Sequence, residues 1–203
     1  MIYQEYQYLY PPRPERKVPP STIGFYEKRG YLAQVKKNGT CTVIFARGDQ
    51  VIFKTRHNDD HKAWTPKLEH VKFFQSNSTS WSVFVGELLH SKTPHIKDQL
   101  YLFDLIVDQG EQLVGSTFLE RQKLLYAKYP NGTYEGDQQR VHQYVSLAVN
   151  FASNFNDVWS RLKVEDEGLV FKKLTGKLEA CFKPSSNEGW QCKSRRPHAN
   201  YSF

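Results

Sequence analysis

The sequence predicts an α+β fold in which mainly antiparallel sheet surrounds a helical middle section. Short runs rich in β-branched and aromatic residues occupy the first half and the last part of the chain, with turn signals between them. Segments with apolar residues at helical spacing lie between those runs. With 203 residues, of which 39% are hydrophobic and 24% charged, the chain suits one domain with its own core.

The first half of the chain contributes five predicted strands. Turn signals at 37–39 and 47–49 separate the first three strands, which indicates an antiparallel meander. The fifth strand is apolar except at Asp104, as is typical of a strand buried on both faces. We expect these strands at residues 31–35, 41–46, 50–55, 81–89 and 99–107.

Helices are predicted in the next part of the chain. Thr117 and Glu120 form a capping box, which opens a helix that runs to about Tyr129. Apolar spacing predicts a second helix over about 139–155 and a short helical turn over 157–162. The remaining strands are expected at residues 168–173, 178–183 and 190–195.

The two ends of the chain differ from this body. Five prolines between residues 11 and 20 predict an extended lead-in over 1–20, followed by one domain over 21–196 and a basic, aromatic tail over 197–203. No apolar run is long enough to span a bilayer, and the N-terminus lacks the apolar segment of a signal peptide. We therefore expect a soluble, cytoplasmic protein with no membrane partner. Three cysteines are too few for a disulfide framework.

Positive charge is concentrated near the C-terminus. The formal net charge is +7, and residues 171–203 alone carry seven Lys or Arg against two Glu. Basic patches attract polyanions, so the charge favours a nucleotide or nucleic acid as ligand. A solvated basic surface with no ligand accounts for the same numbers, and charge alone leaves both interpretations open.

Lys36 is the first candidate for chemistry. It ends an apolar strand directly before the turn at Asn38 and Gly39, where its amine is expected to point into a cavity. A lysine that is partly desolvated, or that lies beside other cations, can act as a nucleophile. The alternative is an ordinary hairpin turn with an exposed lysine.

Further charged residues recur inside apolar strands. Glu87 lies within one such strand, and Glu167 begins another that carries Lys172 five residues later. Lys193 and Arg195 are two residues apart, so they face the same side of a strand. Because buried charges need partners, these residues together suggest carboxylates for a metal or a ribose and cations for a triphosphate. Each residue taken singly also fits a solvent-exposed strand end.

The order of these residues resembles the covalent nucleotidyltransferase superfamily of ATP-dependent DNA and RNA ligases and GTP-dependent mRNA-capping enzymes. Lys36-Lys37-Asn38-Gly39 is similar to the motif that carries the lysine nucleophile of that superfamily. The resemblance covers about residues 20–196. Four further elements resemble the later motifs in the right order, at residues 85–88, 102–104, 167–172 and 193–195.

The resemblance implies a fold and a set of roles. The fold would be an ATP-grasp-like ligase domain with two mainly antiparallel sheets, flanking helices and a nucleotide cleft between the sheets. Lys36 would be the nucleophile, with Lys172 and Lys193 as further catalytic residues that neutralise phosphate charge. Glu87 would hold the ribose, Phe103 would stack on adenine, and Mg²⁺ or Mn²⁺ would bind at Glu167 and Glu87. The implied nucleotide-binding residues are Gln34, Val35, Arg56, Glu87, Phe103, Glu167 and Arg195.

The implied activity is that of an ATP-dependent polynucleotide ligase. AMP would pass from ATP to the lysine and then to a 5′-phosphate end of nicked or broken DNA, with RNA as the alternative substrate, before sealing with a 3′-OH. Two alternatives remain open at this point. One is a capping-type guanylyltransferase that uses GTP, and the other is a non-catalytic or weakly active basic nucleic-acid-binding relic of a ligase domain.

The chain departs from the superfamily pattern at four places. Asn38 stands where the family often has Asp, a change that the motif tolerates. Cys41 stands where an arginine is common, so Arg47 or Arg56 is expected to replace that cation, and Arg195 stands where a second lysine is usual. The sequence ends eight residues after Arg195, and we expect no OB-fold domain. The chain is thus similar to small single-domain ligase-like proteins of bacteriophages, which act in the bacterial cytoplasm, and a partner protein is a candidate replacement for the OB-fold.

Overall fold

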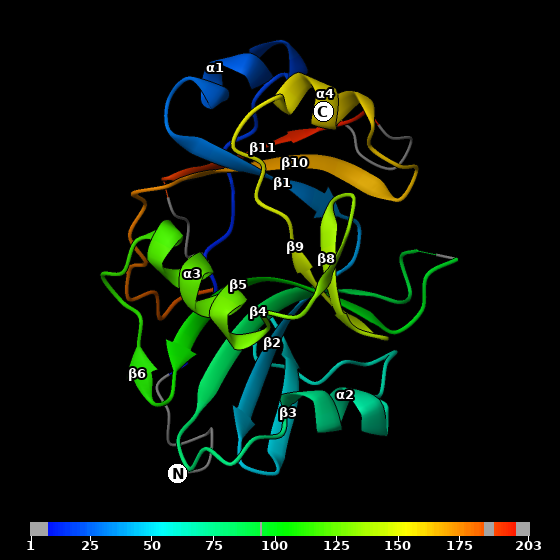
Figure 1. Cartoon of the computed structure of the whole chain (residues 1–203), viewed down its shortest axis with the longest axis vertical. Coiled ribbons are helices and arrows are strands. Elements are labelled where there is room, and N and C mark those ends of the chain that lie inside the picture. Colours follow the sequence, from blue (N-terminus) through cyan, green and yellow to red (C-terminus); the bar gives the residue numbers. More distant parts are fainter. Residues whose placement is uncertain (1–7, 94, 185–188, 198–203) are drawn as a thin grey trace.

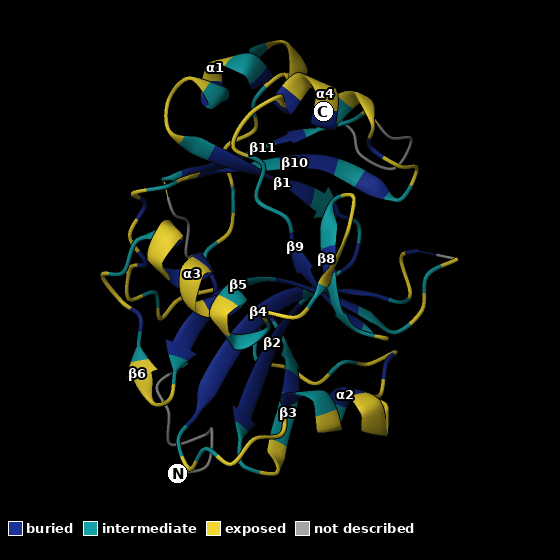
Figure 2. Ribbon diagram, in the orientation of Figure 1, coloured by how far each residue is buried: buried dark blue, intermediate teal, exposed yellow. Residues whose placement is uncertain are grey.

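The computed structural model describes residues 8–93, 95–184 and 189–197, and these form an α+β fold with two mainly antiparallel sheets (Figure 1). The expected α+β class with two mainly antiparallel sheets is therefore confirmed. Both sheets are mostly buried along their strands, whereas the helices expose their outer faces (Figure 2). None of the helices in the described segments is long and apolar enough to cross a membrane.

The larger sheet has eight strands and lies in the lower part of Figure 1. Its strand order is β3-β2-β4-β5-β9-β8-β7, with β6 paired to β5, and only the β5–β9 pairing is parallel among the pairings described. The bounds are β2 (Thr40–Arg47), β3 (Gln50–Thr55), β4 (Ser82–Leu89), β5 (Gln99–Asp108), β6 (Glu111–Gln112), β7 (Thr133–Glu135), β8 (Gln138–His142) and β9 (Val145–Ala148).

Two helices pack against this sheet. Helix α2 (Leu68–Phe74) sets Phe74 against Phe53 and Phe84, and α3 (Phe118–Lys128) packs on β5. Thr117 and Glu120 form the expected capping box at the start of α3, because the Glu120 amide donates to Thr117 Oγ1 and the Thr117 amide donates to Glu120 Oε2.

Arg121 of α3 is the largest fully buried side chain among the described residues, and it explains the buried charge of Asp104 in the mostly apolar strand β5. Its Nε and Nη2 donate to the two carboxylate oxygens of Asp104 at 2.9 and 3.1 Å. A buried carboxylate is stable only with such a partner. The pair therefore fixes α3 to the middle of the large sheet.

The smaller sheet has three strands in the order β1-β10-β11 and lies above the large sheet in Figure 1. Helices α1 (Ile23–Glu27) and α4 (Phe155–Ser160) cover its upper face, where Ile23, Phe155 and Phe171 belong to one apolar cluster. A short 3-10 helix (Pro20–Thr22) precedes α1. The strands are β1 (Tyr31–Lys37), β10 (Asp166–Lys173) and β11 (Gln191–Arg195).

Three sequence predictions are wrong. Strand β1 pairs with β10 rather than β2, so the first three strands do not form a meander. The helix expected over 139–155 is instead the hairpin β8–β9 and a turn into α4, since β9 is held by its pairing with distant β5. Residues 178–183 form no strand, although Leu178 is buried and its amide donates to Ser116 O.

The structure describes only part of the predicted lead-in and of the predicted tail. Residues 8–19 form no helix and no extended strand, and Lys17 makes an isolated bridge to Lys193 of β11. Residues 1–7 of the predicted lead-in, and all of the predicted tail except Pro197, lie outside the described residues.

Candidate active site

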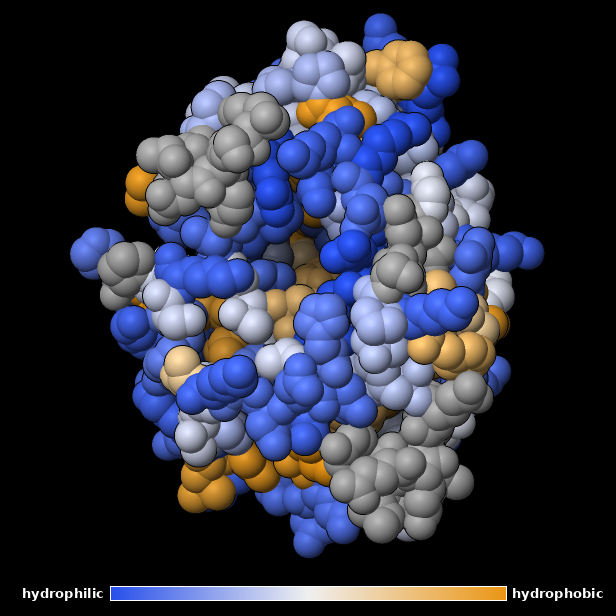
Figure 3. Space-filling model, turned by 180° about the vertical axis from the view of Figure 1, so that it is seen from behind, coloured by the Kyte–Doolittle hydropathy of each residue, from blue (hydrophilic) through white to orange (hydrophobic). Residues whose placement is uncertain are grey.

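A pocket of about 450 Å³ lies between the two sheets. Seen from behind, the molecule is hollowed between its upper and lower parts, and hydrophilic side chains border most of the hollow (Figure 3). Eight lysine or arginine side chains and three glutamates line the pocket, so it favours an anionic ligand. All ten candidate residues line it: Gln34, Val35, Lys36, Arg56, Glu87, Phe103, Glu167, Lys172, Lys193 and Arg195.

The register of the small sheet brings the upper wall together. Lys36, Gly168 and Arg195 are direct neighbours across the three strands, and two residues further along Gln34 and Lys193 occupy the next row of the same face. Because side chains alternate between faces, the rows between them point to α1 and α4. One face of the sheet is therefore apolar, and the other carries the charges of the pocket.

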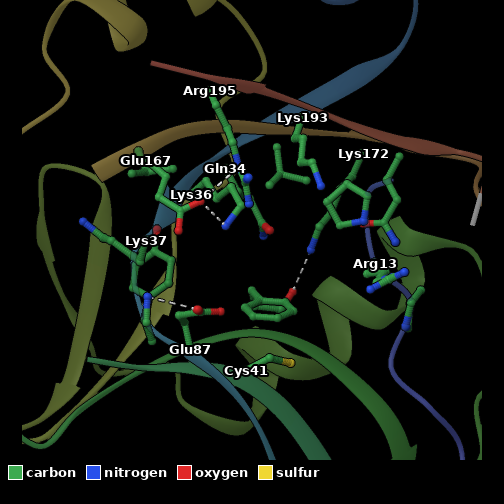
Figure 4. A pocket seen from close by; sticks show the side chains of 18 of the residues that line it. Arg13, Gln34, Lys36, Lys37, Cys41, Glu87, Glu167, Lys172, Lys193 and Arg195 are labelled. Carbon is green, nitrogen blue, oxygen red and sulfur yellow. Dashed lines mark hydrogen bonds and ion pairs between the residues drawn. The ribbon is translucent and has the colours of Figure 1, made fainter. Parts of the chain in front are cut away.

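A β-bulge sets the position of Glu167. The pairing of β1 with β10 shifts between Lys36 and Lys37, which leaves Glu167 without a register partner opposite β1. Its Oε2 lies 2.7 Å from Lys36 Nζ and 3.2 Å from Arg195 Nε (Figure 4). Bulges of this kind turn a side chain toward a site. Gly168, beside it, has φ of +150°, which is unfavourable for residues with a Cβ.

Lys37 lies next to Lys36 in sequence but has a different environment. Its side chain is 5% exposed, and Nζ lies 2.6 Å from Asp137 Oδ2 and 2.8 Å from Asp166 Oδ1. Burial alone lowers a lysine pKa, but the two carboxylates outweigh it, and the pKa of Lys37 is raised. Lys37 thus links the turn between β7 and β8 to strand β10. Lys36, in contrast, presents its amine to the pocket.

The turn after Lys36 is held by the large sheet. Glu87 Oε1 accepts a hydrogen bond from the Gly39 amide at 3.1 Å, Lys92 Nζ donates to Gly39 O at 2.7 Å and Thr93 Oγ1 donates to Asn38 O at 2.9 Å. A Cβ at Gly39 would meet Leu88 O at 2.4 Å, so glycine is required for this close approach. Burial is the main cause that raises the pKa of the Glu87 carboxyl.

Two lysines of the small sheet have lowered pKa values. Burial lowers the pKa of Lys172 to about 8, and its Nζ lies 4.7 Å from the ring centroid of Phe103 and 4.8 Å from that of Phe118. Burial, together with Arg195 and Lys36, also lowers the pKa of Lys193 to about 8. Close cations raise the free energy of the pocket, and a bound anion would relieve that repulsion.

Of the two arginines expected to replace the cation missing at Cys41, Arg56 lies beside Cys41 and Arg47 does not. The Arg56 amide donates to Cys41 O, and both side chains line the pocket. Arg47 instead lies over the ring of Trp81 and is not among the residues that line the pocket. Burial raises the pKa of the Cys41 thiol to about 12, so Cys41 stays protonated at neutral pH.

Sequence reasoning missed several residues of the pocket and its support. Arg13 and Glu15 line it from the lead-in, whose prolines gave no hint of a role in a site. Asn150 accepts from Gln34 Nε2 at 2.8 Å, and Gln122 Nε2 donates to Phe103 O at 3.1 Å. No local signal marks these two amides, because their partners lie far away in the sequence.

A metal ion would need ligands besides the protein. Among the described residues, no group of three or more His, Cys, Asp or Glu side chains lies close enough together to hold one. Glu167 and Glu87 are the pocket carboxylates beside Lys36, and Mg²⁺ commonly binds one or two carboxylates together with phosphate oxygens. The donor set therefore fits Mg²⁺ or Mn²⁺ together with a bound nucleotide.

Comparison with solved structures shows a ligase fold. The ligase domain of LigD from M. tuberculosis superposes with a TM-score of 0.66 at 16% sequence identity, over 94% of this chain and 60% of that one. A mycobacterial DNA ligase D complexed with ATP and MES gives 0.65 at 15% identity, over 94% of this chain and 61% of that one. A Lig E DNA ligase, described as binding DNA with a minimal scaffold, gives 0.55 at 13% identity, over 92% and 69%.

These identities establish the fold and not the activity. The chain has the fold of DNA ligase nucleotidyltransferase domains over most of its length, and it spans about 60% of the two ligase D structures. No family model and no curated protein matches the chain.

Proposed function

We propose that this chain is an ATP-dependent polynucleotide ligase that forms a covalent lysine–AMP intermediate on Lys36. The observation that carries the proposal is convergence in one pocket. Residues as far apart in sequence as Gln34 and Arg195 line it together, and they are the side chains that the ligase reaction requires. The fold, shared with DNA ligases that include one complexed with ATP, supports the same conclusion.

In the first step, the Lys36 ammonium gives up one proton to solvent water, and the neutral Nζ then attacks the α-phosphorus of ATP. A P–N bond forms, the bond from the α-phosphorus to the bridging oxygen breaks, and pyrophosphate leaves. The ion pair with Glu167 orients Nζ, and Lys193 and Lys172 stabilise the negative charge that develops on the phosphate oxygens. Phe103 offers a ring on which the purine stacks.

The divalent metal would be held by Glu167 and Glu87 together with phosphate oxygens. When bound, it supplies positive charge that screens the triphosphate. The protein's own contribution is to position Lys36 through the bulge at Glu167, and to hold the following turn through Glu87 and Gly39.

In the later steps, AMP passes from Lys36 to the 5′-phosphate of a nicked or broken DNA end. The adjacent 3′-OH then attacks that phosphate, and AMP leaves. The basic surplus of the chain favours a nucleic-acid substrate, and the structural relatives named above are DNA ligases.

The first test is covalent labelling. The protein is incubated with α-labelled ATP and Mg²⁺ or Mn²⁺ and is analysed on a denaturing gel. We expect label on the parent protein and none on Lys36→Ala. The matched control is Lys37→Arg, which keeps a cation beside Asp166 and Asp137 but removes the neighbouring amine, and it should keep the label.

Each other outcome has a meaning. Label that persists in Lys36→Ala contradicts the assignment of the nucleophile. Label from GTP alone indicates a capping-type enzyme. Absence of label with both nucleotides, even with nicked DNA present, overturns the enzyme proposal and leaves a nucleic-acid-binding domain. Sealing of a nicked duplex with a 5′-phosphate then tests the later steps.

A further inference from the structure

The N-terminal strap, defined here as residues 11–18, crosses from the large sheet to the small sheet along the pocket. At one end, Arg56 Nε and Nη2 donate to Pro11 O at 3.2 and 3.0 Å. At the other end, the Lys193 amide donates to Arg16 O, and the Val18 amide donates to Lys193 O, both at 2.9 Å. The residues between these anchors, Pro12 to Glu15, line the pocket.

The composition of the strap suits a fixed wall. Pro11, Pro12 and Pro14 restrict φ, and proline-rich segments extend by about 3.1 Å per residue. The five steps from Pro11 to Arg16 therefore span roughly 15 Å. Hydrogen bonds from the Arg56 side chain at one anchor and from backbone amides at the other hold this stiff segment across the gap between the sheets.

Arg13 is the cation that the strap brings to the pocket. Its guanidinium forms an ion pair with Glu15, and its side chain remains 45% exposed, so it is accessible to a ligand. Besides burial, Arg13 contributes to lowering the pKa values of both Arg56 and Lys193, which places it within electrostatic range of the two. Arg13, Arg56 and Lys193 therefore present three cations to the pocket at the strap and its two anchors.

The position of Lys193 links this cation cluster to the reacting lysine. Lys193 lies one side-chain repeat from the Lys36 row, which corresponds to about 7 Å along the strand. It is also the residue of β11 that pairs with the strap. A phosphate chain that begins at Lys36 and continues past Lys193 thus arrives at Arg13.

We propose that Arg13 binds the phosphates beyond the α-phosphate of a bound nucleoside triphosphate, the part that leaves as pyrophosphate. This inference rests on the proposed function, because that function fixes the α-phosphate at Lys36. The strap would then favour a triphosphate over a monophosphate in the pocket. Glu15 orients the guanidinium until the ligand arrives.

The test compares the binding of ATP, AMP and inorganic tripolyphosphate by calorimetry. The full chain carries Lys36→Ala in every case, which prevents covalent transfer. Adding Arg13→Ala should lower the affinity for ATP and for tripolyphosphate about tenfold, as expected for the loss of a charge-assisted hydrogen bond. The affinity for AMP should change less than about twofold. Arg13→Lys should recover part of the loss.

The matched control is Arg161→Ala, which removes the same charge from a site outside the pocket. Arg161 is 68% exposed and pairs with Asp157 at the end of α4. No ligand should bind more than twofold differently to this variant. Unfolding midpoints of all variants verify that they are folded.

Several outcomes separate the strap from the enzyme. Equal loss of ATP and AMP binding, or no loss of either, overturns the role of Arg13 even where the parent protein is labelled. Weaker tripolyphosphate binding in Arg13→Ala supports the role of Arg13 even where no label forms. The missing label then counts against the proposed function alone. A parent chain that binds neither ATP nor tripolyphosphate overturns both.

Discussion

The two sheets that enclose the pocket are built on different principles. The large sheet buries the central strands β4, β5 and β9 almost entirely, and it contributes only a few groups to the pocket, among them Glu87 and Phe103. The small sheet buries one face against α1 and α4 and devotes the other to charge. From that face come Lys36, Lys172, Lys193 and Arg195.

This difference indicates how each sheet is stabilised. The large sheet is stabilised mainly by apolar packing, which tolerates single substitutions because the stability is distributed over many contacts. The charged face of the small sheet gains little from apolar burial. Its geometry therefore depends on a few backbone contacts and ion pairs, and single changes there are expected to cost more than similar changes in the large sheet.

The largest difference in the free energy of unfolding is expected between two glycine substitutions, one in the small sheet and one in a turn of the large sheet. In Gly168→Ala, the Cβ would lie 2.0 Å from Ser194 O at a φ of +150°, so β10 and β11 cannot keep their pairing. We expect a loss of about 4 kcal/mol or more in the free energy of unfolding. In Gly48→Ala, in the β2–β3 turn, the nearest contact is 3.7 Å and the expected loss is about 1 kcal/mol. Urea unfolding measures both, and equal losses would contradict the comparison.

The next contrast is between the two neighbouring lysines. Lys37→Met leaves the buried Asp166 carboxylate without its cation and leaves Asp137 with Lys163 alone at 3.9 Å, which is expected to cost about 3 kcal/mol. Lys36→Met should cost less than about 1 kcal/mol, because Arg195 still pairs with Glu167. Chemical denaturation gives both values. Adding Asp166→Asn to Lys37→Met should recover part of the loss, and no recovery would argue against this ion pair as the cause.

The smallest expected effect is a pH dependence that originates in the small sheet. The pKa of Lys172 is about 8 in the folded protein against an ordinary value of 10.5, so between these values the unfolded chain binds more protons. Stability should therefore rise with pH across this range, by about 2 kcal/mol between pH 7.5 and 9.5, relative to Lys172→Met. Thermal unfolding at both pH values measures the difference, and a falling difference would reverse the sign of this argument.

Much of the fold follows from local patterns. The predicted strands near 31–35, 41–46, 50–55, 81–89 and 99–107 all correspond to β1–β5, and the capping box at Thr117 does begin α3. The error at 139–155 has a physical cause. Short apolar runs fit helix and strand equally well, and the parallel pairing of β9 with β5 holds this segment as a strand.

The candidate site also has features that local sequence patterns predict and features that they do not. Spacing within the chain places Lys193 and Arg195 on one face, and the Asn38-Gly39 turn ends β1 directly after Lys36 and Lys37, because period-two alternation and turn chemistry are local properties. These features were accessible from the sequence with no structure at hand.

Tertiary structure supplied the partners. It turned Lys36 to the pocket and buried Lys37 against Asp166, which is 129 residues away, and it brought Arg13 of the proline-rich lead-in into the pocket that Lys193 also lines. No local pattern specifies such pairs, because each depends on which distant strands meet and in which register. The sequence thus determined which chemical groups are present and in what order, and the folded chain determined which of them face one another.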